Sequence, residues 1–171
     1  MLQHEGVRYL AVAFADEGVL LRSKGITMPI VVLNADQDSF DVMISHDLEP
    51  EIYNFRSLDE FRRAVHRAHR FGYPIHIKLD TGMHRLGFME KELPELLEFL
   101  KNNKRIKVQS IYSHLAASDE PQHDEFTLGQ IALYEKMAPQ IDAALGYKPI
   151  HHILNSAGIE RFTQYQFDMA R

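Results

Sequence analysis

Short apolar and β-branched runs alternate along this chain with longer segments whose apolar residues recur at helical spacing. Seven such runs predict strands, at residues 9–14, 30–34, 51–55, 75–80, 110–116, 151–155 and 166–171. Parallel neighbours can be joined only through a crossover, so a strand–helix repeat predicts parallel pairing. No linker or low-complexity segment interrupts the repeat. The pattern therefore predicts an α/β fold.

Three segments between these runs predict helices. In 57–71 the apolar residues share one stripe, and Ser57 with Glu60 forms a capping box at the start. The other two helices are predicted at 93–100 and 125–145. Each segment lies between two predicted strands, as a crossover connection requires.

The run 75–80 separates two possible architectures because its residues alternate strictly between two faces. The apolar face has Ile75, Ile77 and Leu79, and the polar face has His76, Lys78 and Asp80. A central strand of a doubly wound sheet is apolar on both faces, whereas a barrel strand can turn polar groups toward a ligand. We therefore favour a (β/α)8 barrel of the TIM type. Such a barrel has eight strands, so we expect the chain to lack one.

Composition excludes several classes of protein. The 171 residues include no cysteine, which excludes a disulfide framework, a zinc–thiolate site and a thiol nucleophile. A net charge of −5 provides no general attraction to nucleic acid or to an anionic membrane. No apolar run approaches the roughly 20 residues of a membrane span, and no signal-peptide pattern is present. We expect a soluble, cytoplasmic protein.

The segment HIKLDTGMHRLGF is the most informative part of the chain. Lys78 and Asp80 point the same way from the strand, and two glycines allow a tight loop that returns Arg85 toward the strand end. Polar groups that converge at a strand's C-terminal end are the active-site pattern of barrels; the alternative is a buried ion pair without chemistry. The Asp-Thr-Gly tripeptide matches aspartic proteases, but their fold is all-β and uses two such loops, so we reject that reading.

Two further strand ends carry candidate residues. The segment HHILNSAG opens into Asn155 and Ser156, whose backbone N–H groups and hydroxyl can hold a phosphate, although a short polar turn is usually only a turn. His114 ends another predicted strand, where a lone histidine is more often a hydrogen-bonded core residue than a catalyst. The ten histidines show no recognised ligand spacing, so we predict no metal site. The basic residues between 62 and 70 predict a solvated helix face.

Taken together, HIKLDTGMHRLGF, SHLAASD, HHILNSAG and FDMAR resemble alanine racemase, a pyridoxal-phosphate enzyme with a barrel domain followed by a β domain. The segments LAVAFADEGVLLR and PIVVLN resemble the second and third barrel strands of that family. The resemblance covers essentially the whole chain in the right order. The residues of these segments are most similar to the Bacteroidetes type of the family, which is often fused to a UDP-N-acetylmuramoyl-tripeptide–D-alanyl-D-alanine ligase.

The resemblance implies three catalytic residues. Arg85 would contact the phenolic oxygen of the cofactor and the carboxylate of the substrate. Lys78 matches a lysine that is carbamylated in many members and orients this arginine. Two cations that face each other in a barrel would repel, whereas a carbamate would turn Lys78 into an anionic partner for Arg85. His114 would lie beside the cofactor.

The resemblance also implies four cofactor-binding residues. Ser156, with Asn155 beside it, would bind the phosphate. His152 would support Arg171, which would face the pyridine nitrogen. A guanidinium group keeps its protons, so Arg171 would donate to this nitrogen and leave it unprotonated. The ring would then be a weaker electron sink, which favours exchange of the Cα proton over transamination.

The same comparison implies that residues 1–171 form an incomplete N-terminal barrel domain. The family's Schiff-base lysine lies on a first strand that precedes this chain, and its tyrosine base comes from the C-terminal β domain of the partner subunit. We expect the intact parent, a homodimer, to interconvert L- and D-alanine for peptidoglycan synthesis. We expect the isolated chain to be inactive.

Two other functions remain open from the sequence. In a Schiff-base aldolase, Lys78 would be the barrel lysine, with its pKa lowered by desolvation. A non-catalytic barrel protein would bind pyridoxal phosphate without turnover, but such proteins lack the HIKLDTGMHRLGF pattern.

Overall fold

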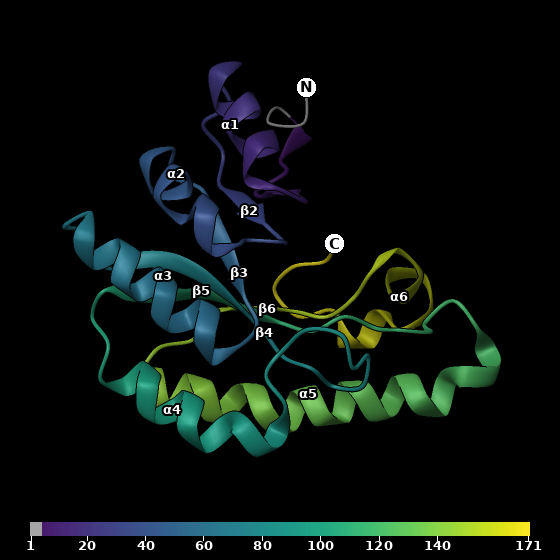
Figure 1. Cartoon of the computed structure of the whole chain (residues 1–171). Coiled ribbons are helices and arrows are strands. Elements are labelled where there is room, and N and C mark those ends of the chain that lie inside the picture. Colours follow the sequence, from purple (N-terminus) through teal and green to yellow (C-terminus); the bar gives the residue numbers. More distant parts are fainter. Residues whose placement is uncertain (1–4) are drawn as a thin grey trace. The chain divides into compact units, whose positions relative to one another are not determined.

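The computed structural model describes residues 5–171 (Figure 1). Its strands are β1 (Leu10–Val12), β2 (Ile30–Val32), β3 (Glu49–Ile52), β4 (Tyr73–Lys78), β5 (Ile106–Tyr112) and β6 (Ile150–His152). Its α-helices are α1 (Ala15–Ser23), α2 (Phe40–Ser45), α3 (Phe55–Arg67), α4 (Leu93–Lys101), α5 (Asp124–Leu145) and α6 (Ser156–Arg161). Short 3-10 turns are η2 (Gln37–Ser39), η3 (Glu90–Glu92), η4 (Pro121–His123) and η5 (Thr163–Tyr165).

The strands follow one another in the sheet in chain order, β1-β2-β3-β4-β5-β6. β1 pairs with β2, β2 with β3, and β5 with β6, in parallel each time. A doubly wound sheet reverses its strand order at a switch point. The order of the described strands contains no reversal, so the predicted parallel α/β class is confirmed and the doubly wound alternative is excluded for this part of the chain.

The chain divides into two compact units. The first comprises the described residues up to His76 together with Lys104–Lys107, and the second comprises Ile77–Asn103 and Val108–Arg171. Every predicted site residue from Lys78 to Arg171 belongs to the second unit. No helix in the described part of the chain has the length and apolar character needed to cross a bilayer.

The described residues form six strands, so the prediction of seven is wrong. The segment 166–171 is not a strand, although it follows β6 through backbone hydrogen bonds. The N–H groups of Asp168 and Met169 both donate to His151 O, at 3.0 and 3.2 Å, and Arg171 N donates to Leu154 O at 3.0 Å. Two successive amides that share one carbonyl break the alternation of a regular parallel ladder. The segment is therefore held beside β6 without ladder geometry.

The start of α3 also differs from the prediction. Its N-cap is Asn54, whose Oδ1 accepts a hydrogen bond from Ser57 N at 2.8 Å. The predicted capping box of Ser57 and Glu60 is wrong because Ser57 already lies within the helix, where its hydroxyl donates to Asn54 O at 3.0 Å. Since Phe55 begins α3, the predicted strand at 51–55 lies too late.

The first unit has an aromatic core. Phe61 of α3 is fully buried and meets Phe40 edge-on, with 5.0 Å between ring centroids, and Tyr73 with 5.5 Å. The Tyr73 hydroxyl donates to Leu48 O at 3.0 Å, so this buried polar group is satisfied. The apolar stripe of α3 predicted by the periodicity is the face that enters this core.

In the second unit α4 and α5 pack side by side (Figure 1). Leu96 of α4 and Ile131, Met137 and Ile141 of α5 are buried. Tyr134 of α5 is also buried, and its hydroxyl donates to Ile111 O of β5 at 2.8 Å. This bond fixes the long helix against the strand whose C-terminal end leads to His114.

Candidate active site

The C-terminal ends of three strands carry the predicted site residues. Lys78 is the last residue of β4, His152 is the last residue of β6, and His114 follows β5 by two residues. β6 leads into α6, which begins at Ser156. Parallel strands place their carboxyl ends at one edge of a sheet, so the topology gathers these residues in the second unit.

An aromatic contact joins two of these strand ends. The Nζ atom of Lys78, a buried residue, lies 5.8 Å from the centroid of the Tyr112 ring. That ring stacks on His152 with 4.6 Å between centroids and 6° between planes. Tyr112 and His152 are register partners in the β5–β6 pair, so their side chains leave the same face. Sequence analysis missed Tyr112, although it shares its strand parity with His114.

Arg171 lies against His114. Its Nη2 is 3.4 Å from His114 Nδ1, and because a guanidinium group only donates, Nδ1 is the acceptor. Burial, and then the positive charges of Arg171, Lys78 and Arg85, hold the pKa of His114 below its ordinary value of 6.5. His114 is therefore neutral at pH 7. Arg171, Lys78 and Arg85, all site residues predicted from the sequence, therefore act on His114. His152, another predicted site residue, has its ring stacked on Tyr112.

The loop after β4 folds back on its own strand. Phe88 N donates to Lys78 O and Asp80 N donates to Phe88 O, both at 2.9 Å. Gly87 has φ +134°, and a Cβ atom there would lie 2.5 Å from Asp80 N. Glycine is therefore required for this close approach, as the glycine spacing predicted.

Asp80 is engaged in the loop and does not face a ligand beside Lys78. Its buried Oδ1 accepts hydrogen bonds from the backbone N–H groups of Gly82 and His84, both at 3.0 Å. Its Oδ2 lies 3.3 Å from His84 Nδ1. The carboxylate therefore shapes the turn that presents Arg85, an exposed residue. The expectation that Asp80 converges with Lys78 and Arg85 on a ligand is wrong for Asp80, because its carboxylate is bound within the loop.

Asn155 has a comparable structural task at the start of α6. Its Oδ1 accepts from Gly158 N at 2.9 Å and from the Ser118 hydroxyl at 2.8 Å, while Nδ2 donates to Leu115 O at 3.2 Å. The side-chain amide thus caps α6 and ties it to the segment after β5. Ser156 beside it is exposed. Ser118 was missed by sequence analysis, although it lies within the segment SHLAASD.

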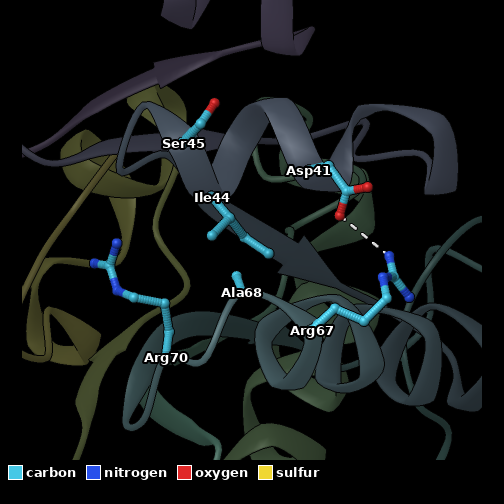
Figure 2. Close-up of a pocket in the computed structure, with 6 residues that line it drawn as sticks. All are labelled: Asp41, Ile44, Ser45, Arg67, Ala68 and Arg70. Atoms are coloured by element: carbon cyan, nitrogen blue, oxygen red, sulfur yellow. Dashed lines mark hydrogen bonds and ion pairs between the residues drawn. The ribbon is translucent and has the colours of Figure 1, made fainter.

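One open pocket lies in the first unit, between α2 and the end of α3 (Figure 2). Its volume is about 480 Å³, and its lining residues are Asp41, Ile44, Ser45, Arg67, Ala68 and Arg70. Arg67 pairs with Asp41 at 3.1 Å, and Arg70 pairs with Asp47 at 2.8 Å. These exposed pairs agree with the solvated basic face expected from the sequence. None of the predicted site residues lines this pocket.

Within residues 5–171, no group of three or more His, Asp or Glu side chains is arranged to hold a metal ion. Parallel strands in chain order, with polar residues gathered at their carboxyl ends, define the class of the protein. It is a β/α domain whose second unit has a positively charged site around a neutral histidine.

The family model for the alanine racemase N-terminal domain matches residues 1–171, and the chain belongs to that family. The alanine racemase of Symbiobacterium thermophilum is 32% identical over 168 residues, which are 97% of this chain and 44% of the relative. The chain therefore spans less than half the length of the curated relatives it matches.

Solved structures agree in fold. The alanine racemase of Clostridium difficile 630 in complex with cycloserine has a TM-score of 0.91 and 30% identity, covering 99% of this chain and 47% of that one. The alanine racemase of Bartonella henselae with covalently bound pyridoxal phosphate has a TM-score of 0.83 at 23% identity, covering 99% and 48%. The latter likeness concerns the fold alone.

Proposed function

We propose that this chain is the cofactor-holding part of a pyridoxal-phosphate-dependent alanine racemase. The observation that carries the proposal is the cationic cluster at His114: Arg171 Nη2 lies 3.4 Å from His114 Nδ1, and the positive charge of Arg85 also acts on that ring. In its phosphate and phenolic oxygen, pyridoxal phosphate presents anionic groups that such a cluster attracts. The donor set therefore fits this cofactor. When bound, pyridoxal phosphate supplies the electron sink that makes the Cα proton of an amino acid removable.

Arg171 sets the protonation of the site. As a permanent donor, it would face the pyridine nitrogen of the cofactor without giving up a proton. The His114 ring, kept neutral, accepts from Arg171 through Nδ1 and leaves the positive charge on the guanidinium group. An unprotonated pyridine ring would be a weaker electron sink, so Arg171 would favour proton exchange at Cα over transamination.

Arg85 and Lys78 act on the substrate side. Arg85, presented by the loop that Asp80 shapes, would bind the substrate carboxylate and the phenolic oxygen of the cofactor. Lys78 is buried, and two cations that face each other in a barrel would repel. Carbamylation of Lys78 would replace this repulsion with an anionic partner that orients Arg85.

The phosphate is assigned to the start of α6. Because the Asn155 side chain is engaged as N-cap, exposed Ser156 would supply the hydroxyl and the backbone would supply N–H groups. Asn155 thus acts by shaping the phosphate site. The lysine that forms the Schiff base and the tyrosine base are assigned to segments outside residues 1–171. On this proposal the chain is an incomplete (β/α)8 barrel domain and has no racemase activity alone.

The whole protein is proposed to be a cytoplasmic homodimer that produces D-alanine for peptidoglycan. The segments SHLAASDEPQHDEF and HILNSAGIERF support the ligase-fused Bacteroidetes type. A chimera tests the function directly. In the Symbiobacterium thermophilum enzyme, the aligned 168 residues are replaced by this chain. The chimera should interconvert L- and D-alanine, and it should lose this activity when Arg85 is changed to Ala, whereas Arg56→Ala should be neutral.

Failure of a folded chimera that binds pyridoxal phosphate to racemise alanine would overturn the racemase proposal. Turnover by the isolated chain would contradict its expected inactivity. Borohydride trapping of a carbonyl substrate on Lys78 would instead favour the aldolase.

A further inference from the structure

A buried glutamine on α5 contacts the segment that carries His114. Gln130 is 1% exposed. Its Nε2 donates to His114 O at 3.1 Å, and its Oε1 accepts from Ala116 N at 2.9 Å. The segment 113–116 belongs to no helix or strand, so these two bonds replace the ladder bonds that β5 no longer provides.

The same side chain supports the loop that carries Arg85. A Cβ atom on Gly82 would lie 3.1 Å from Gln130 Cγ and 3.2 Å from Phe126 Cζ, and Gly82 has φ +145°. The loop backbone therefore rests directly on the stem of Gln130. One side chain thus contacts both segments that present predicted catalytic residues.

Packing alone does not require an amide at this place. Around Gln130, α5 buries the side chain of Ile131 and the ring of Tyr134, and a methionine has a similar length and volume. A buried amide is favourable only when its polar atoms are paired, since an unpaired one is costly. Both polar atoms of Gln130 are paired with backbone groups of the His114 segment. The amide therefore specifies the position of that segment.

We propose that Gln130 is a positioning residue that holds the His114 segment and the Arg85 loop together, so that His114 faces the cations of the site. The catalytic meaning of this role rests on the proposed function, but the geometry can be tested without cofactor. The charged groups that act on His114 are Arg171, Lys78 and Arg85.

The test is an NMR titration of His114 in the 171-residue chain, with its signal assigned by comparison with His114→Gln. Gln130→Met keeps the length of the side chain and removes both hydrogen bonds. We expect the pKa of His114 to rise toward its ordinary value in this variant, because the released segment leaves the buried, positively charged surroundings. Gln140→Met is the matched control, since Gln140 lies exposed on the same helix and its Nε2 donates to Lys136 O at 2.8 Å.

An unchanged His114 titration in folded Gln130→Met would overturn the proposal, and so would an equal shift in Gln140→Met. If Gln130→Met does not fold, amide exchange in the unchanged chain decides. Slow exchange of the Ala116 N–H supports the positioning role of Gln130, and exchange at the rate of an unprotected amide overturns it. If the unchanged chain does not bind pyridoxal phosphate, this result would count against the proposed function. The comparison of the His114 titration between Gln130→Met and Gln140→Met would still test the role of Gln130.

Discussion

The rings of Tyr112 and His152 stack face to face at the ends of β5 and β6, with 4.6 Å between their centroids. They are register partners, so the parallel pairing itself brings them together. Lys78 Nζ contacts the stack from the β5 side, 5.8 Å from the centroid of the Tyr112 ring. The stack therefore links the strand geometry of the second unit to its cation-rich site.

The stack should contribute measurable stability. Tyr112→Leu should lower the free energy of unfolding by about 1 kcal/mol more than Tyr112→Phe, because phenylalanine retains a ring that can stack on His152. Urea unfolding of the two variants measures the difference. Equal free energies of unfolding for the two variants would show that the ring contact adds nothing.

Gly87 should tolerate no side chain. Gly87→Ala places a methyl group against the Asp80 backbone at a positive φ, and we expect it to lower the free energy of unfolding by about 3 kcal/mol. Gly129→Ala is the matched control, because Gly129 lies within α5 and its Cβ position meets no atom within 4 Å. That substitution should raise the free energy of unfolding by about 0.5–1 kcal/mol. A neutral Gly87→Ala would contradict the described loop.

The stability of the chain should depend on pH through His114. Burial and the charges of Arg171, Lys78 and Arg85 lower the pKa of His114 in the folded state below its ordinary 6.5. The unfolded chain therefore binds the proton more readily, and folding loses stability as pH falls below 6.5 until the folded-state pKa is reached. His114→Gln should remove this part of the pH dependence.

Urea midpoints measured across this pH range test the prediction, with His66→Gln as the control, since His66 is exposed on α3. An identical pH dependence for His114→Gln and the unchanged chain would count against the lowered pKa.

Lys78 should acquire one carbon dioxide. In buffer with ¹³C-labelled bicarbonate, we expect one carbamate carbonyl signal that disappears in Lys78→Ala. The signal should persist in Lys136→Ala, because Lys136 is an exposed lysine whose Nζ pairs with Glu90 at 2.5 Å. A Lys78-dependent signal would support the racemase assignment. A chain that forms no carbamate would remove the proposed anionic partner of Arg85.

The sequence predicted those features that depend on neighbouring residues. The alternation of Ile75 and Ile77 with polar residues located β4, and the glycine spacing anticipated the turn at Gly87. The apolar stripe around Phe61 located α3. In each case the signal lies within one turn or one strand, so local physics decides the outcome.

The features that were missed depend on partners far away in the sequence. Strand β5 ends at Tyr112 and not at Ala116, because Ala116 N bonds to Gln130 on α5. The Asn155 side-chain amide, whose role as the N-cap of α6 the sequence did not reveal, is engaged by Gly158, Ser118 and Leu115. Sequence pattern alone does not reveal which distant group will satisfy a given amide. The stack of Tyr112 on His152 is similar, since it follows from the register of two strands.

Equilibrium binding of pyridoxal phosphate to the 171-residue chain tests most directly whether the second unit is a cofactor site. We predict saturable binding that inorganic phosphate competes away. Arg171→Ala should weaken it about tenfold, a loss of ~1.4 kcal/mol, while Arg56→Ala leaves it unchanged. Binding that does not saturate, or that is equally strong in Arg171→Ala, would contradict the assignment of the cofactor to this cluster.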